Sequence, residues 1–297
     1  MTQEEVLDKL ASDIRLRGMS EGTVLAYCTQ ASFFMNYFNK SADEMGEKEF
    51  RIFLEYLNRE RNLKPTTFNN YNSALRFLFE VTLEQNLNYK RVPRKRLPST
   101  IPNALTREEI VAFLQVIDDP RYKAIFSITY GSGLRLSEVQ KLRIQDVDST
   151  QMRLFIYQAK GQKDRYVPLA HSSLEALRAY YKITRPKHPL GYLFLSRCGD
   201  DYLSGAAIHE AFKKYYNQSG IKSYATIHTL RHSYATHLME DGVNIFFIQR
   251  LLGHATLVTT MRYLRIAYTD LMKTKSPLDG IEQKCITTSR QEISNHD

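Results

Sequence analysis

The chain has 297 residues, and its 41 Lys and Arg against 32 Asp and Glu give a net charge of +9. That length suffices for two domains with a sizeable core, and the excess of positive charge favours a polyanionic partner. No stretch approaches the roughly 20 apolar residues of a membrane span, and the acidic, polar N-terminus is unlike a signal peptide. The three cysteines are widely spaced, without a CxxC pair. We therefore expect no disulfide framework, no cysteine zinc site and a cytoplasmic protein that does not enter a membrane.

Residues 1–92 predict a helical domain. Ser20 caps a segment in which apolar residues recur every three or four positions, a second such segment follows, and Pro65 opens a third. The expected inward positions are Val24, Tyr27, Ala31, Phe34, Phe38, Phe50, Phe53, Leu54, Leu57, Phe68, Tyr71, Leu75, Leu78 and Phe79. The third segment leaves polar residues outside, which either meet phosphates and base edges or are simply solvated. These residues are Thr66, Thr67, Asn69, Asn70 and Ser73.

A basic run, KRVPRKR, occupies residues 90–96 and places five cations in seven positions. It lies at the start of a predicted linker, residues 93–103. Runs of like charge are usually solvated chain. The alternative is that these cations contact the phosphates of a DNA backbone. Its cations are Lys90, Arg91, Arg94, Lys95 and Arg96.

The second domain is predicted over residues 104–275. Thr106 and Glu109 form a capping box that starts its first helix. Further helices are expected at 121–130, 136–142, 172–181, 206–217, 229–240 and 244–251, and a strand pair at 154–157 and 165–169. The fold class is thus mainly α with a small β-sheet. Residues 276–297 lose periodicity and form a tail, which either reaches another subunit or is disordered.

Four strings in the second domain carry chemistry. They are YGSGLRLSE around Arg135, AKGQKDRYVPL around Lys160, HTLRHSYATHL from His228, and LLGHATLVTTMRYL from Leu251. A phosphodiester that reacts with a nucleophile passes through a more highly charged arrangement, which needs neutralising. Two guanidinium groups can supply the positive charge without a metal ion, because each holds two phosphate oxygens at once. Arg135 and Arg231 fit this role.

A tyrosine is a plausible nucleophile for such a site once a base assists it, because its unperturbed pKa is about 10. His228 and Arg231 stand three positions apart, so a helix would present a proton acceptor and a phosphate clamp on one face. A departing 5′ oxygen needs a proton in turn. Lys160 sits at the tip of the predicted strand pair, from which it could deliver one.

In their order and intervals, the four strings resemble the tyrosine recombinase (phage integrase) family, and the N-terminal hundred residues resemble that family's core-DNA-binding domain. The resemblance implies a site-specific DNA recombinase, closer to Xer-like or mobile-element integrases than to large phage integrases. Such an enzyme cleaves and rejoins double-stranded DNA through a 3′-phosphotyrosyl intermediate. It works as a homotetramer on two DNA sites and needs no cofactor.

The resemblance also implies the roles of single residues. Tyr263, nine positions after His254, takes the place of the nucleophile, while Tyr268 is a nearby decoy. His254 hydrogen-bonds the phosphate, and Lys160 is the general acid. The expected catalytic set is Arg135, Lys160, His228, Arg231, His254 and Tyr263.

Each of these residues also has an interpretation without a catalytic role. Arg135 could be a surface arginine at a helix start, and Lys160 beside a glycine suits any solvated turn. The histidines could be structural, or, with His232 and His237, could bind a metal, although the zinc-protease pattern needs a Glu where Thr229 stands. At the level of the whole protein, a type IB topoisomerase shares the tyrosine chemistry, and a DNA-binding protein with a dead site is the other alternative. The isolated GSG before Arg135 predicts a turn rather than a nucleotide-binding loop.

Overall fold

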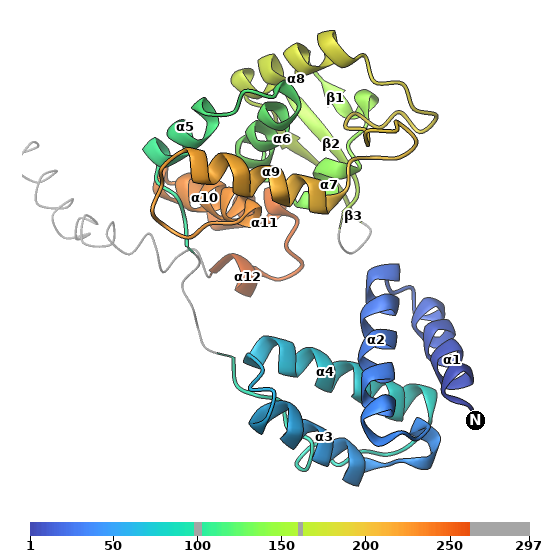
Figure 1. Cartoon of the computed structure of the whole chain (residues 1–297). Coiled ribbons are helices and arrows are strands. Elements are labelled where there is room, and N and C mark those ends of the chain that lie inside the picture. The colour runs from blue at the N-terminus through green and yellow to red at the C-terminus, as the bar shows by residue number, and fades with distance from the viewer. Residues whose placement is uncertain (98–102, 160–162, 262–297) are drawn as a thin grey trace, which may run out of the picture. The chain divides into compact units, whose positions relative to one another are not determined.

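The computed structural model describes residues 1–97, 103–159 and 163–261 (Figure 1). Contacts between residues divide the chain into two compact units, Met1–Ser99 and Thr100–Asp297. No helix in the described ranges is long and apolar enough to span a membrane.

The first unit is built from four helices. They are α1 (Gln3–Leu16), α2 (Glu21–Phe38), α3 (Glu47–Arg59) and α4 (Pro65–Phe77), with a 3₁₀ turn at Ala42–Glu44 and a π-helical turn at Leu78–Thr82 that continues α4. Ser20 caps α2 as expected, since its hydroxyl accepts the Thr23 N–H at 3.3 Å. Pro65 is the first residue of α4, where its missing N–H has no helical partner to lose.

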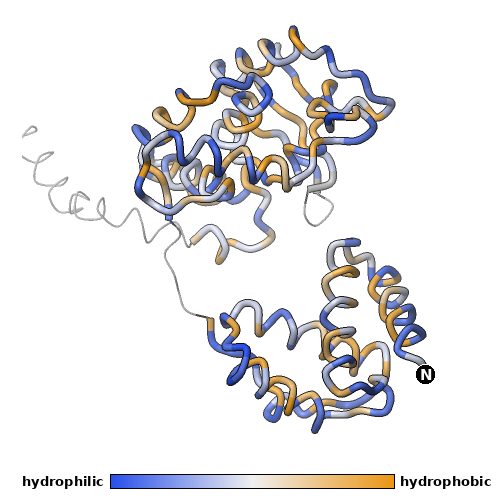
Figure 2. The backbone as a smooth tube through the Cα atoms, viewed as in Figure 1, coloured by the Kyte–Doolittle hydropathy of each residue, from blue (hydrophilic) through white to orange (hydrophobic). Residues whose placement is uncertain are grey.

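The core of the first unit is aromatic. Phe34, Phe53 and Phe79 are fully buried, and the Phe34 ring meets the other two edge-on at centroid distances of 5.2 and 5.7 Å. Apolar and hydrophilic stretches alternate along these helices, as an amphipathic bundle requires (Figure 2). Of the expected inward positions, only Tyr27, Phe38 and Tyr71 are partly buried rather than buried.

The basic run is part of the first unit. The Asn69 side-chain amide donates to the Lys95 carbonyl at 2.9 Å and accepts the Lys95 N–H at 2.8 Å, as a paired strand would. Asn72 donates to the Pro93 carbonyl at 3.0 Å, and the buried Val92 joins the helical core. The chain over 90–96 is therefore tied along α4, which a free linker would not be.

The second unit contains eight described α-helices and a small sheet. They are α5 (Arg107–Gln115), α6 (Pro120–Gly131), α7 (Leu136–Gln140), α8 (His171–Thr184), α9 (Gly205–Gln218), α10 (Ile227–Glu240), α11 (Ile245–Leu252) and α12 (Leu257–Met261). The capping box predicted for α5 is present: the Thr106 hydroxyl accepts the Glu109 N–H at 3.2 Å, and the Glu109 carboxylate accepts the Thr106 N–H at 2.9 Å. Helix α6 packs against both α8 and α10.

The sheet has three antiparallel strands in the order β1 (Val147–Asp148), β2 (Arg153–Ala159) and β3 (Lys163–Pro168). Its inner face buries Leu154, Ile156 and Val167. Because side chains alternate along a strand, Arg165 lies on the same face as Val167. The prediction of a mainly α fold with a small sheet is confirmed, although β1 was not foreseen and α7 ends two residues earlier than expected.

Candidate active site

The end of α11 gathers three arginines from distant parts of the sequence. Three successive carbonyl oxygens each accept a hydrogen bond from a different guanidinium: Leu251 from Arg165 (2.7 Å), Leu252 from Arg231 (2.5 Å) and Gly253 from Arg135 (2.7 Å). The last carbonyls of a helix have no partner within it and carry partial negative charge. The arginines satisfy both needs, so the turn after α11 fixes where their charges lie.

One buried carboxylate, that of Glu138 in α7, lies among these arginines. Its Oε1 accepts from Arg135 Nη1 at 2.6 Å and from Arg165 Nη1 at 2.9 Å, while its Oε2 accepts from Arg165 Nη2 at 2.8 Å. Arg231 Nη1 lies 3.7 Å from Oε2. The Glu138 side chain is 5% exposed.

The carboxyl group of Glu138 is ionised at neutral pH. Burial opposes its charged form, but the hydrogen bond and charge of Arg165, and then those of Arg135, outweigh burial and lower the pKa of Glu138 to about 2. One negative charge therefore stands among three guanidinium groups. The cluster keeps an excess of two positive charges, as a site for an anion requires.

His254 follows the α11 turn directly. Its Nδ1 lies 2.9 Å from the Thr260 hydroxyl of α12. Burial lowers the pKa of His254 to about 4, with the charges of Arg231 and Arg135 acting in the same direction. The imidazole is thus neutral at pH 7, and a neutral ring can donate one hydrogen bond and accept another.

His228 lies in the first turn of α10, whose described start at Ile227 is two residues earlier than expected. The residue is exposed, and its ring is 6.4 Å from that of His209 in α9. The protein packed around the imidazole, then the charges of His209 and Arg231, lower the pKa of His228. A lowered pKa favours the unprotonated ring, the form that can accept a proton.

The structure therefore brings together four of the six predicted catalytic residues: Arg135, Arg231 and His254 around the α11 turn, and His228 where it feels the charge of Arg231. The other two lie outside the described residues. Lys160 comes directly after Ala159, the last residue of β2, and Tyr263 comes two positions after Met261, the last residue of α12.

Glu138 and Arg165 were not anticipated. Arg165 had a signal in the sequence, because the alternation through RYVPL places it on the face of Val167 rather than on the solvent side. Glu138 sits three residues after Arg135 in a capping arrangement, and its Oε2 accepts the Arg135 N–H at 2.8 Å. The usual capping signature begins with Ser or Thr, so an arginine at that position hides it.

The GSG string forms the predicted turn after α6. Gly133 has a φ of 62°, and a Cβ there would lie 2.3 Å from Cδ1 of Tyr234, so only glycine fits. The Gly133 carbonyl accepts from Arg231 Nη1 at 2.7 Å. This turn and the α11 turn therefore both hold the Arg231 guanidinium.

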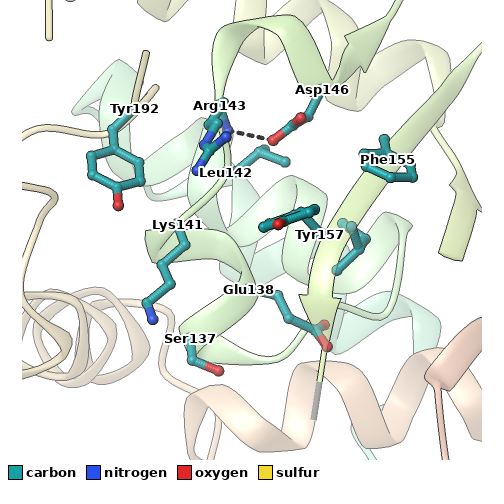
Figure 3. A pocket seen from close by; sticks show the side chains of 10 residues that line it. Ser137, Glu138, Lys141, Leu142, Arg143, Asp146, Phe155, Tyr157 and Tyr192 are labelled. Carbon is teal, nitrogen blue, oxygen red and sulfur yellow. Dashed lines mark hydrogen bonds between the residues drawn. The ribbon is translucent and has the colours of Figure 1, made fainter. Parts of the chain in front are cut away.

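A hollow of about 210 Å³ adjoins the cluster (Figure 3). Glu138 and Lys141 line it from α7 and the residue after it, and Phe155 and Tyr157 line it from β2. Beside it the Arg143 N–H donates to the Asp146 carboxylate at 2.9 Å.

Of the two further candidate histidines, His232 is half-buried, and His237 is buried with its Nδ1 2.9 Å from the Tyr130 hydroxyl. Among the described residues, no three His, Cys, Asp or Glu side chains cluster as metal ligands.

In the first unit, the polar residues predicted to face DNA divide into two groups. Thr66, Thr67 and Asn70 are exposed. Asn69 and Ser73 are half-buried, because Asn69 pairs with the Lys95 backbone and the Ser73 hydroxyl accepts from Arg94 Nη2 at 3.1 Å. The expected outer position is therefore met in full by the first group and only in part by Asn69 and Ser73, and contact of any of the five with DNA stays a prediction.

The cations of the basic run also differ from one another. Lys90, Arg94 and Arg96 are exposed. Arg91, exposed as well, pairs with Glu47 at 3.4 Å. Lys95 is half-buried, with its ammonium 4.6 Å from the Phe68 ring centroid.

Comparison with known proteins agrees with these features. The model of the phage integrase family matches residues 103–270, and that of the phage integrase N-terminal SAM-like domain matches residues 6–89. The chain is 37% identical over 272 residues to a Sinorhizobium fredii protein named integrase/recombinase y4qK, with 91% of this chain and 87% of the relative covered. It is 34% identical over 282 residues to the tyrosine recombinase XerA of Thermococcus onnurineus, with 94% and 96% covered.

Among solved structures, that of XerA recombinase is 26% identical and matches with a TM-score of 0.54 over 93% of this chain and 100% of that chain. Relatives above 30% identity span almost the whole sequence, and one family model covers more than half of it. The chain therefore belongs to the phage integrase family, the tyrosine recombinases.

Proposed function

We propose that the chain is a site-specific DNA recombinase in which Tyr263 attacks a phosphodiester held by Arg135 and Arg231. The main support for this function is the group of arginines around Glu138 at the end of α11. Three guanidinium groups and one carboxylate leave two positive charges in excess, beside two histidines whose pKa values are lowered. A pentavalent phosphate carries more negative charge than the diester, so this excess stabilises the transition state over the ground state.

Residues of the site account for every bond and proton that changes in strand cleavage. The Tyr263 oxygen forms a bond to phosphorus while the bond to the 5′ oxygen breaks. The neutral imidazole of His228 accepts the tyrosine proton, and Lys160 supplies a proton to the departing oxygen. Rejoining is the reverse reaction with the 5′ hydroxyl of another strand. The bond energy stays in the phosphotyrosyl linkage, so the scheme requires no nucleotide hydrolysis and no cofactor.

His254 serves the non-bridging oxygens. With Nδ1 engaged by the Thr260 hydroxyl at 2.9 Å, the ring can carry its proton on Nε2 and donate from there to a phosphate oxygen. A donor that is neutral in the free protein becomes more basic when an anion binds beside it. We expect the phosphate to raise the pKa of His254.

The first unit supplies sequence-independent contacts with double-stranded DNA. The exposed cations Lys90, Arg94 and Arg96, with the exposed Thr66, Thr67 and Asn70 of α4, form the surface we assign to the backbone. We assign residues 1–92 to a core-DNA-binding domain and residues 104–275 to the catalytic domain. The basic run over residues 90–96 belongs to the first unit, where we assign it contacts both with α4 and with the DNA backbone.

We infer that four protomers assemble on two DNA duplexes and that the protein acts in the cytoplasm. The tail over residues 276–297, which either reaches a neighbouring protomer or is disordered, lies outside the described residues. Strand exchange between two duplexes separates this function from that of a topoisomerase, which would only relax supercoils.

Covalent capture tests the function. Wild-type protein is incubated with sheared DNA of the source genome and denatured, and the covalently attached fragments are sequenced to define the site. A nicked duplex carrying that site loses its short 5′ fragment after cleavage, so the covalent product accumulates. We expect Tyr263→Phe to bind this duplex without forming the product, and Tyr268→Phe to form it. Covalent product from Tyr263→Phe, or its loss only in Tyr268→Phe, would overturn the assignment.

A further inference from the structure

We propose that Arg165 is a positioning residue for strand cleavage, which offsets the charge of Glu138 so that Arg135 and Arg231 remain available to the phosphate. The inference rests on the proposed function and adds a residue outside the six predicted ones. Arg165 acts on the phosphate site indirectly, through its contacts with Glu138 and with the α11 turn.

Arg165 joins three elements of the site. From β3, its Nε donates to the Leu251 carbonyl at the end of α11 at 2.7 Å. Its two terminal nitrogens donate to the two oxygens of Glu138 in α7 at 2.9 and 2.8 Å. This forked pair is the geometry that a guanidinium makes with a carboxylate and that an ammonium cannot make. The Arg165 side chain is 9% exposed, so water does not replace these contacts.

The turn that carries His254 is packed directly on the same guanidinium. A Cβ on Gly253 would lie 3.1 Å from Nη1 and 3.3 Å from Cζ of Arg165, and 3.4 Å from Nη1 of Arg135. The guanidinium thus occupies the space beneath the turn. Displacing Arg165 would remove hydrogen bonds from both Glu138 and the α11 turn, which would then be held by Arg135 and Arg231 alone among these three arginines.

Arg165 has an electrostatic role as well as a packing role, because it offsets the charge of Glu138. Glu138 accepts from Arg165 on both oxygens, and from Arg135 Nη1 at 2.6 Å on one of them. Of the three arginines at the end of α11, only Arg135 and Arg231 would remain to neutralise the Glu138 carboxylate if Arg165 were removed. The excess positive charge of the cluster would fall from two to one, and Arg135 would be drawn further toward Glu138 and away from a phosphate.

A purely structural role predicts a different pattern, and a double-mutant cycle separates the two. The cycle uses Arg165→Gln, Glu138→Gln and the double variant Arg165→Gln/Glu138→Gln. The double variant removes one positive and one negative charge, so it restores the excess of two. If charge balance matters, it should cleave faster than Arg165→Gln. If Arg165 only fills space, the two losses add and the double variant is the slowest.

The measurement is the first-order rate of covalent product formation at saturating protein on the nicked duplex. We expect Arg165→Gln to be slowed at least about 100-fold, as misplacement of a catalytic group by about 1 Å can cause. The double variant should recover at least about tenfold of that loss, within the coupling range of contacting residues. Arg165→Lys keeps the charge but not the fork, and should be at least about tenfold slower than wild type.

The matched control is Arg153→Gln. Arg153 is another arginine of the sheet, on β2, where it pairs with Asp148 at 3.1 Å and is 36% exposed. Its rate should stay within about twofold of wild type, since exposed pairs of this kind contribute little. Thermal unfolding of each variant checks that it is folded.

Two results would overturn the proposal. One is a wild-type rate in Arg165→Gln or, if that variant does not fold, in Arg165→Lys. The other is a double variant no faster than Arg165→Gln. Wild-type protein is measured alongside on the same duplex. If it gives no product that depends on Tyr263, the proposed function fails; if it does and the Arg165 variants are normal, only this inference fails.

Discussion

Replacing Gly253 with alanine should slow strand cleavage strongly while lowering the stability of the fold only moderately. Gly253 ends α11 with a φ of 62°, in the left-handed region. An L-residue there costs roughly 1–2 kcal/mol, which corresponds to a fall in melting temperature of about 2–8 °C for a unit of this size. Gly242, after α10, has a φ of 77° and nothing within 4 Å of an added Cβ. Gly242→Ala is therefore a control that introduces the same backbone strain without a clash.

The two variants differ in what the new methyl group meets. At Gly253 it would lie 3.1 Å from Arg165 Nη1, closer than an ordinary van der Waals contact, and Arg165 is already held by Glu138 and Leu251. The arginines must shift, which weakens the bond from Arg135 to the Gly253 carbonyl, at 2.7 Å in the native protein. Hydrogen bonds from charged groups contribute about 1.5–3 kcal/mol, or about 10- to 100-fold in rate at 1.4 kcal/mol for each factor of ten.

The assay measures melting temperature and single-turnover cleavage of the nicked duplex for both variants. We expect similar losses of melting temperature, cleavage within about threefold of wild type for Gly242→Ala, and cleavage about 10- to 100-fold slower for Gly253→Ala. Equal cleavage by the two variants would refute the reasoning, because it would show that the arginine cluster tolerates displacement of the α11 turn.

Three further predictions concern separate parts of the site. Lys160→Ala should cleave an ordinary duplex slowly but a duplex with sulfur at the bridging 5′ position nearly as fast as wild type, since a thiolate leaves without protonation; no rescue would move the acid elsewhere, with Lys163 the next candidate. Glu138 stabilises the fold above its unfolded pKa of about 4.5 and loses that contribution as pH falls toward about 2. The free energy of unfolding of wild type should therefore drop by about 2 kcal/mol more than that of Glu138→Gln between about pH 5 and pH 3 in denaturant titrations, and parallel curves would contradict the pairing. Changing Lys90, Arg94 and Arg96 to Gln should weaken binding to specific and random duplexes alike and reduce the salt slope by up to roughly 0.9 for each phosphate that the variant no longer neutralises; weaker binding of the specific site alone would assign this run to base readout.

Local pattern was enough to predict most helices of both units, although α1 was not foreseen. Phe34 and Phe53 are buried where the three-four spacing placed them, and the capping box of Thr106 starts α5. These features depend on neighbours within one or two turns, which a sequence shows directly. The end of α7 was predicted wrongly, because the Leu142 carbonyl accepts the Leu193 N–H at 2.8 Å and the chain leaves the helix to meet it.

The site was predictable only in part, because a sequence shows local neighbours directly but not contacts between distant residues. Arg135, Arg231 and His254 stand in recognisable strings, and the structure brings them to one turn. The network that holds them depends on pairs distant in sequence, such as Arg165 and Leu251, which no local pattern encodes. Asn69 shows the converse: its place on a polar helix face predicted exposure, and its pairing with the Lys95 backbone uses both of its amide atoms.

The central claim is that the arginines at the end of α11 form the phosphate site of a tyrosine nucleophile. A structure of the protein trapped covalently on its cleaved DNA tests this claim most directly. We expect a 3′ phosphate joined to Tyr263, with its free oxygens within hydrogen-bonding distance of the guanidinium groups of Arg135 and Arg231, and Glu138 still paired with Arg165. A phosphate joined to another side chain, or bound away from both guanidinium groups, would contradict the account.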